Sequence, residues 1–172
     1  MHIIINLFGG PGSGKSTTAS GLFHLLKLKG YKTELITEFT KDVVWEQRYK
    51  TLENQFYISA KQHHKIWRVL KYYEDHGIKD SIIITDSPLL LGILYNKNNS
   101  VSYQFFNNFI LTEFLQISPF QTTNLNIFLN RVKDFDPHGR VQSKEEAERI
   151  DDDIYDLLEY YNIDFHEVNC LD

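Results

Sequence analysis

Cysteine is almost absent from this chain. Its scarcity limits the kinds of catalysis the protein can use and indicates the cellular compartment in which we expect it. Cys170 is the one cysteine among 172 residues, so no internal disulfide can form. Chains without disulfides are typical of reducing compartments, and we therefore expect a cytoplasmic protein. A lone cysteine at this position is a poor candidate nucleophile, and no Ser-His-Asp pattern is legible. The sequence gives no indication of covalent catalysis.

Long hydrophobic runs are missing as well. No segment approaches the ~20 apolar residues that a bilayer-spanning helix requires. The first apolar run, residues 2–8, ends in glycines and lacks the basic lead and cleavage site of a signal peptide. We therefore expect this run to be a first β-strand, and we expect no membrane association.

Positive charge is also limited. The 18 Lys and Arg residues are outnumbered by 23 Asp and Glu residues, which gives a net charge of -5. Affinity for nucleic acid rests on neutralising phosphates with basic side chains, so a surface built throughout for DNA or RNA is not favoured. A local basic patch remains open. The histidines show no chelating pair, since His63 and His64 are adjacent and diverge on a helix.

Short apolar runs alternate with helical stretches along the chain. This alternation predicts an α/β fold in which helices cover both faces of a parallel sheet. The expected strands are residues 3–8, 33–37, 81–85, 125–129 and 163–168. The expected helices are residues 15–29, 41–75 with a break near 51–54, a helix from Pro88, 101–117 and 143–161. The length is that of one domain, which we expect to span residues 1–172.

A glycine-rich segment between the first strand and the first helix carries the clearest signal. It satisfies the pattern G-x-x-x-x-G-K-[ST] at every fixed position, in the strand-to-helix context that the pattern demands. Glycines let the backbone curl so that successive N–H groups face the phosphate oxygens, and the helix adds its positive end. The residues expected to bind the phosphates of ATP are Gly10, Pro11, Gly12, Ser13, Gly14, Lys15, Ser16 and Thr17.

Three side chains are expected to complete a Mg-ATP site. Lys15 bridges the β- and γ-phosphates, and the Ser16 hydroxyl contributes to the Mg²⁺ shell. Asp86 ends the strand of residues 81–85, where an acid in this kind of fold holds the metal. The alternative for Asp86 is a helix N-cap before Pro88, although Ser87 is also suited to that role.

With these motifs, the chain resembles the P-loop nucleoside and nucleotide kinases, nearest to the small branch typified by nicotinamide riboside kinase domains and their phage-borne relatives. The likeness extends over nearly the whole chain, but only the phosphate loop is highly specific. It implies a P-loop fold with a five-stranded parallel sheet in the order 2-3-1-4-5. It also implies transfer of the γ-phosphate of Mg-ATP to a small nucleoside or nucleotide acceptor.

The resemblance also implies roles near the second strand. Glu38 stands where related nucleoside kinases keep a carboxylate that accepts the proton of the acceptor hydroxyl. Asp42, four residues later, faces the same way if a helix has begun. Lys41 stands where nucleotide kinases often have an arginine that holds the acceptor phosphate, which leaves nucleoside and nucleotide acceptors both open. The alternative for Glu38 is a helix-start carboxylate that interacts with the helix dipole.

The long helix carries further candidates. Gln62 resembles the glutamine that such kinases direct at the acceptor base, and its alternative is a solvated surface amide. Lys61, Lys65, Arg68 and Lys71 share one helical face. These four cations are either a solvated stripe or a cradle for acceptor phosphates, with Arg68 as a candidate ligand.

Residues 131–143 are expected to form a mobile lid, because they hold charges, Pro137 and Gly139 with few apolar anchors. Within this segment, Arg131, Lys133 and Arg140 flank residues 134–139. Arginines that move in on closure stabilise the charge of the transferred phosphoryl group and exclude water. An ordinary charged surface loop is the alternative. Ser143 and Glu146 fit the capping-box spacing at the start of the next helix.

Two other functions stay open. The basic stripe supports a kinase that acts on DNA or RNA ends or modified bases. A P-loop ATPase acting as a regulatory switch is less favoured, because Asp86 is followed by Ser87 and not by a glutamate that activates water. A guanine-reading Asn-Lys-x-Asp motif is not found. The sequence does not decide the acceptor or the oligomeric state, and a homodimer remains open.

Overall fold

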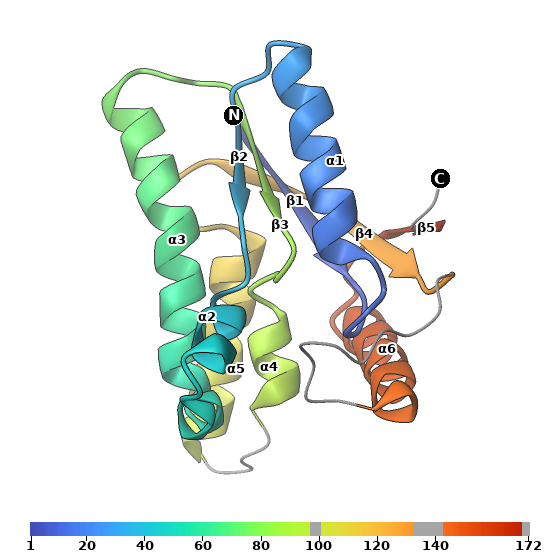
Figure 1. Cartoon of the computed structure of the whole chain (residues 1–172). Helices are drawn as coiled ribbons and strands as arrows, with labels where there is room; N and C mark the ends of the chain where they lie inside the picture. Colours follow the sequence, from blue (N-terminus) through green and yellow to red (C-terminus); the bar gives the residue numbers. More distant parts are fainter. Residues whose placement is uncertain (97–100, 133–142, 170–172) are drawn as a thin grey trace.

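The computed structural model describes residues 1–96, 101–132 and 143–169, with only the backbone at residues 101 and 102. Five parallel strands form one sheet in the order β2-β3-β1-β4-β5 (Figure 1). The strands are β1 (His2–Phe8), β2 (Thr33–Ile36), β3 (Ser81–Thr85), β4 (Thr122–Asn130) and β5 (His166–Asn169). This topology confirms the predicted α/β P-loop fold and strand order.

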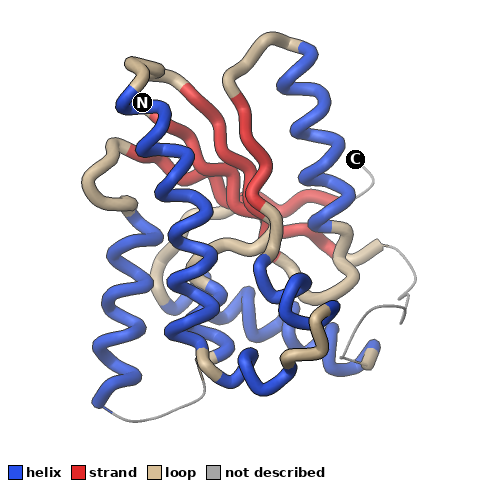
Figure 2. The backbone as a smooth tube through the Cα atoms, turned by 60° about the vertical axis from the view of Figure 1, so that its left-hand side comes forward, coloured by secondary structure: helices blue, strands red, loops and turns tan. Residues whose placement is uncertain are grey.

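Helices cover both faces of the sheet (Figure 1 and Figure 2). They are α1 (Lys15–Leu28), α2 (Phe39–Trp45), the 3₁₀ helix η1 (Tyr49–Glu53), α3 (Gln55–Asp75), α4 (Leu91–Tyr95), α5 (Val101–Leu115) and α6 (Lys144–Tyr160). One face packs on α1 through residues that include Ile5 and Ile84. The other face packs on α3 through Ile4 and Ile83, and on α4, α5 and α6 around Phe8.

Two-sided burial explains the unbroken apolar runs in the sequence. Neighbouring residues of a strand point to opposite faces, so a strand that is covered on both sides needs apolar residues throughout. In β1, Ile4 and Ile5 are 2% and 6% exposed and belong to clusters on opposite faces. The runs therefore identify the inner strands of the sheet.

The predicted start of the fourth strand at residue 125 is wrong by three residues. β4 begins at Thr122, and its first residues pair with the start of β1. The polar residues of this segment are satisfied by partners that the sequence does not show. The Asn6 side-chain amide donates to Asn124 and to Asn126, each at 2.9 Å. Tertiary hydrogen bonds thus allow polar side chains inside the strand.

Other boundaries follow local interactions. The predicted break in the helix of residues 41–75 is confirmed, because α2 ends at Trp45 and α3 begins at Gln55, where Asn54 accepts a bond from the Tyr57 N–H at 3.1 Å. The helix expected from Pro88 is the short α4, which begins three residues later, at Leu91. β5 is shorter than predicted, because Ile163 packs into the core and pairing with β4 begins at His166. Most of the predicted lid lies outside the described residues.

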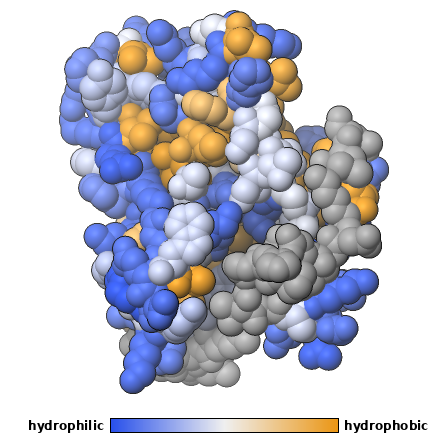
Figure 3. All heavy atoms as spheres, in the orientation of Figure 1, coloured by the Kyte–Doolittle hydropathy of each residue, from blue (hydrophilic) through white to orange (hydrophobic). Residues whose placement is uncertain are grey.

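The edge strand β2 lies between α1 and α3 on the face shown in Figure 1. Hydrophobic side chains are visible on this face between the two helices (Figure 3). Within the described residues, no helix combines the length and the apolar character needed to cross a membrane.

Candidate functional site

The glycine-rich loop lies at the C-terminal ends of the strands, between β1 and α1. Gly9, Gly12 and Gly14 have φ angles of 134°, 87° and 96°, a region that residues with a Cβ rarely enter. Helix α1 begins directly after Gly14, and no side chain caps its first turn. The loop therefore presents backbone N–H groups and a helix N-terminus at the same place, which is an arrangement suited to anions.

Lys15 folds back over this loop. Its Nζ donates to the carbonyl oxygens of Gly9 at 2.5 Å and Gly10 at 2.8 Å. Burial lowers the pKa of Lys15 from its ordinary value, although the carboxylates of Glu38, Asp86 and Asp151 oppose that shift. An anionic ligand would stabilise the charged form of an ammonium group that is buried against neutral carbonyl oxygens.

Asp86 joins the loop to the second strand. It is 3% exposed and follows β3 directly. One carboxylate oxygen accepts a hydrogen bond from the Ser16 hydroxyl at 2.7 Å, and the other accepts from the Glu38 N–H at 3.0 Å. Helix α4 begins five residues later, at Leu91, so these bonds do not cap it. The structure thus brings Ser16, Glu38 and Asp86 together.

The oxygens of Ser16 and Asp86 fit a hard divalent cation. Mg²⁺ prefers oxygen ligands, and a hydroxyl and a carboxylate are both of that kind. The two oxygens lie side by side, 2.7 Å apart in a hydrogen bond. Ser16 and Asp86 would hold the ion, which would neutralise charge on the phosphate oxygens. The Lys41 ammonium also reaches the Ser16 hydroxyl, at 2.9 Å.

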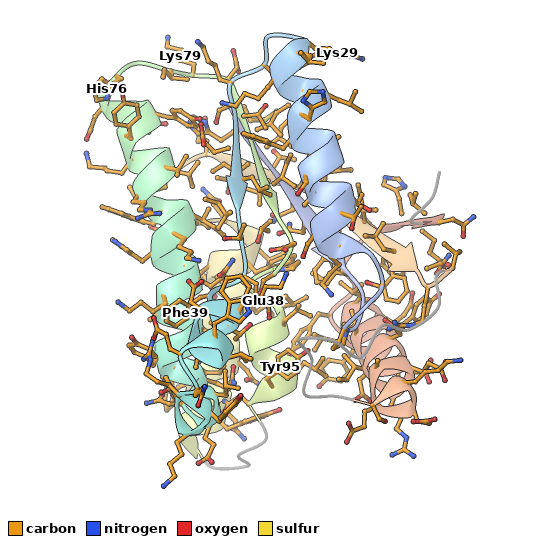
Figure 4. All side chains as sticks on the ribbon, viewed as in Figure 1. Lys29, Glu38, Phe39, His76, Lys79 and Tyr95 are labelled. Carbon is orange, nitrogen blue, oxygen red and sulfur yellow. The ribbon has the colours of Figure 1, made fainter. Side chains whose placement is uncertain are left out.

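The start of α2 forms the opposite side of the site. Glu38 is the N-cap residue of α2, and its side chain accepts a hydrogen bond from the Thr40 hydroxyl, not from the N–H groups of the helix. Figure 4 shows Glu38 and Phe39 at the same end of the sheet as Tyr95, with Lys29 at the other end. Asp42 is exposed and lies 3.7 Å from the Lys65 ammonium.

Gln62 is 5% exposed and is therefore not a solvated surface amide. Its Oε1 accepts from the Phe39 N–H at 3.2 Å, and its Nε2 donates to the Thr85 hydroxyl at 3.3 Å. The amide connects α3 to the start of α2 and to the end of β3. A role at the acceptor stays a prediction, and the second N–H and the second lone pair of the amide are the groups that could serve it.

The four cations on α3 do not act as a unit. Lys65 is half-buried and donates to the Thr37 carbonyl at 3.0 Å, whereas Lys71 pairs with Asp75. Lys61 lies 5.5 Å from the Tyr57 ring centre. Arg68 is exposed, and among the contacts of the described residues none joins it to the phosphate loop.

Arg131 lies beside the loop at the end of β4. It forms an ion pair with Asp151 of α6 at 2.7 Å, and its Nη1 donates to the Pro11 carbonyl at 2.9 Å. Its charge contributes to the lowered pKa of Lys15. Arg140, the second predicted lid arginine, lies outside the described residues. The capping box predicted at Ser143 and Glu146 is present at the start of α6.

The sequence did not point to Tyr95 or to Asp151. Burial raises the pKa of the Tyr95 phenol to about 12, with smaller contributions from Glu38, Asp151 and Asp153. The residue as a whole is 38% exposed. Neither residue belongs to a motif, since a tyrosine at the end of a short helix and an aspartate within an acidic run are both ordinary surface patterns.

A cavity of about 540 Å³ lies at the opposite end of the sheet, lined by His2, Trp67, Lys71 and Phe120 among others. The buried histidine of this cavity is already paired. His2 is buried between Ser81 and Glu74, with its ring nitrogens at 2.8 Å and 3.2 Å from their oxygens. We therefore take the phosphate loop as the candidate site, because the buried Lys15 and Asp86 and the N-terminus of α1 lie there.

Comparison with family models shows which family the chain belongs to. A family model described as an AAA domain (AAA_28) matches residues 4–171. The chain belongs to this family. As a P-loop domain, this AAA domain implies a nucleotide as ligand.

Solved structures share the fold of this AAA domain at low sequence identity. Thymidylate kinase from Ehrlichia chaffeensis is 16% identical, with a TM-score of 0.62 over 98% of this chain and 87% of that one. Deoxyadenosine kinase from M. mycoides with bound dATP is 20% identical, with a TM-score of 0.56 over 99% of this chain and 92% of that one. No curated protein matches by sequence. At these identities the likeness establishes the fold alone.

Proposed function

We propose that this protein is a Mg-ATP-dependent phosphotransferase that moves the γ-phosphate to a hydroxyl or phosphate of a small nucleoside-type or nucleotide-type acceptor. The observation that carries the proposal is the position of Asp86, whose two oxygens bind the Ser16 hydroxyl and the Glu38 N–H. One buried carboxylate thereby joins the donor side of the site to the residue proposed as base. The kinase-like fold is a further support.

On the donor side, the loop amides and the α1 N-terminus bind the phosphates, and Lys15 exchanges its carbonyl partners for β- and γ-phosphate oxygens. That exchange is favourable because a charged acceptor makes a stronger hydrogen bond than a neutral carbonyl. Arg131 adds a fixed positive charge beside the loop. Arg140 is proposed to approach the transferred group from the lid.

On the acceptor side, Glu38 accepts the proton of a hydroxyl group. As the acceptor oxygen bonds to the γ-phosphorus, the bond between that phosphorus and the β-γ bridging oxygen breaks, and ADP leaves. A phosphate acceptor needs no base but needs cations, and Lys41, whose ammonium group is 2.9 Å from the Ser16 hydroxyl, is a candidate. Gln62, Asp42 and Arg68 are proposed to contact the rest of the acceptor.

The deciding experiment measures ADP release from Mg-ATP with and without a panel of nucleosides, their 5′-monophosphates and nicotinamide riboside. We expect at least one acceptor to stimulate ADP release and to become phosphorylated, as detected by mass spectrometry. Nicotinamide riboside is included because of the sequence resemblance to that branch. ADP release that no acceptor changes would identify an ATPase and end the proposal.

A matched pair of lysine variants tests the donor side. Lys15→Ala should weaken ATP binding by roughly 10- to 150-fold, because charge-assisted hydrogen bonds contribute about 1.5–3 kcal/mol. Lys29→Ala is the control, since Lys29 caps the other end of the same helix. Equal ATP affinity in the two variants would contradict the assignment of the loop.

A further inference from the structure

Asp151 of α6 contacts the phosphate loop with both oxygens of its carboxylate. Oδ1 accepts a hydrogen bond from the Gly10 N–H, and Oδ2 accepts from the Arg131 Nε at 3.0 Å and Nη2 at 2.7 Å. The side chains of Arg131 and Asp151 are only 12% and 18% exposed. A paired and largely buried carboxylate of this kind has few alternative positions, so it fixes what it binds.

Arg131 extends this contact to the next residue of the loop. Its Nη1 donates to the Pro11 carbonyl at 2.9 Å, and its Nη2 is 3.5 Å from the Ala147 carbonyl. Asp151 therefore holds the N–H of Gly10 directly and the carbonyl of Pro11 through Arg131. Two successive residues of the loop are fixed by one ion pair.

The packing around Gly10 leaves no room for a side chain. A Cβ atom at Gly10 would lie 2.6 Å from the Ala147 carbonyl oxygen and 2.8 Å from Asp151 Oδ1. Helix α6 thus approaches the loop backbone closely, and its own first turn is fixed by the capping box of Ser143 and Glu146. The loop is braced against a regular element of the fold.

We propose that Asp151 is a positioning residue for nucleotide binding, acting through Gly10 and Arg131. It fixes the first half of the phosphate loop so that the later N–H groups already face the phosphates. A glycine-rich loop without this brace would have to be ordered during binding, and that ordering would reduce affinity. The proposal depends on ATP binding at the loop, as the proposed function requires, but not on the acceptor.

The test compares ATP dissociation constants, measured calorimetrically at a temperature well below unfolding. Asp151→Asn removes the charge that Arg131 pairs with and should weaken ATP binding roughly 10- to 100-fold. Asp152→Asn is the matched control, because Asp152 is the next residue of the same helix and is exposed. The Michaelis constant for the acceptor should stay unchanged in both variants.

Two further variants separate positioning from a loss of stability. Asp151→Glu retains the carboxylate and should recover part of the affinity. Combining Asp151→Asn with Arg131→Met should weaken binding no more than the stronger single change, because both remove the same link. If Asp151→Asn does not fold, Arg131→Lys provides the test, since it keeps a positive charge but loses the two-point pairing and should also bind ATP more weakly.

The possible results are distinct. ATP binding by Asp151→Asn within twofold of the unchanged protein, or additive effects in the double variant, would overturn the role of Asp151 and leave the proposed function intact. The same holds if Arg131→Lys, used in place of a misfolded variant, binds ATP normally. Failure of the unchanged protein to bind ATP would overturn the proposed function together with this inference.

Discussion

At the scale of single residues, the site depends on charged groups whose burial lowers the stability of the folded protein unless a partner compensates them. The Lys15 ammonium is buried against carbonyl oxygens, and its pKa is lowered. Asp86 is buried between a hydroxyl and a backbone N–H. Burial of charged groups that are only partly compensated is frequent where a ligand of opposite charge supplies the missing interaction.

The lowered pKa of Lys15 predicts proton uptake on ATP binding. As the pH rises through the lowered pKa towards 10.5, the folded protein without ligand loses the Lys15 proton before the unfolded chain does. The unfolded chain then binds more protons, so the folded state gains stability in this alkaline window. Phosphate oxygens favour the ammonium form, so ATP binding takes up a proton there and ATP affinity falls as the pH rises.

Calorimetry in alkaline buffers of different ionisation enthalpy measures this proton uptake. Lys15→Arg serves as the control, because a guanidinium group stays protonated throughout this range. If both proteins take up the same number of protons, another group is responsible for the linkage.

Glu38→Gln tests the proposed base. For a hydroxyl acceptor, it should lower kcat roughly 10²- to 10⁴-fold, the usual contribution of a general base, with little change in ATP affinity. Glu46→Gln, at the exposed end of the same helix, should behave like the unchanged protein. A normal kcat for Glu38→Gln with a hydroxyl acceptor would exclude Glu38 as the base.

At the scale of elements, the close contact between α6 and the phosphate loop gives Gly10 much less space for a side chain than Gly21 has. Gly10 meets the Ala147 carbonyl at 2.6 Å when a Cβ is added, whereas Gly21, in the middle of α1, meets nothing within 4 Å. An alanine is thus excluded at one position and favoured at the other.

Alanine substitutions at these two glycines should have opposite effects. Gly21→Ala should stabilise the protein by about 0.5–1 kcal/mol, because alanine has the higher helix propensity, and raise Tm by roughly 1–4 °C. Gly10→Ala should lower Tm and weaken ATP binding, since α6 or the loop must move. Thermal unfolding with and without ATP measures both effects, and a stabilising Gly10→Ala would contradict the packing described here.

At the scale of the whole molecule, the sheet connects two hydrophobic layers. Ile83 packs towards α3 and Leu129 towards α1, and both are fully buried. If residues 1–172 form one domain, as the sequence predicts, both layers must unfold together.

Ile83→Ala and Leu129→Ala should therefore each lower the midpoint of a single urea transition. The expected loss is about 2–5 kcal/mol for each variant, the usual effect of emptying a buried aliphatic site. Tryptophan fluorescence and circular dichroism should report the same midpoint. Leu28→Ala, at a position that is 72% exposed, is the control. Two separate transitions would show that the layers belong to independent units.

The sequence by itself determined the parallel α/β fold and the phosphate loop, because both are local patterns. Apolar runs report two-sided burial, and a glycine motif between strand and helix specifies a backbone shape. It also pointed to Asp86, since strand ends in a parallel sheet meet at one edge. Glu38 was indicated by the resemblance to nucleoside kinases.

Only the tertiary structure decided what contacts what. Asp151 and Gly10 are 141 residues apart in the chain, and nothing local to either residue indicates the other. The same holds for the asparagine side chains that extend β4 and for the burial of Gln62. Polar groups inside a protein are tolerated only with partners, and long-range partners are supplied by the packing of whole elements, which a local pattern does not encode.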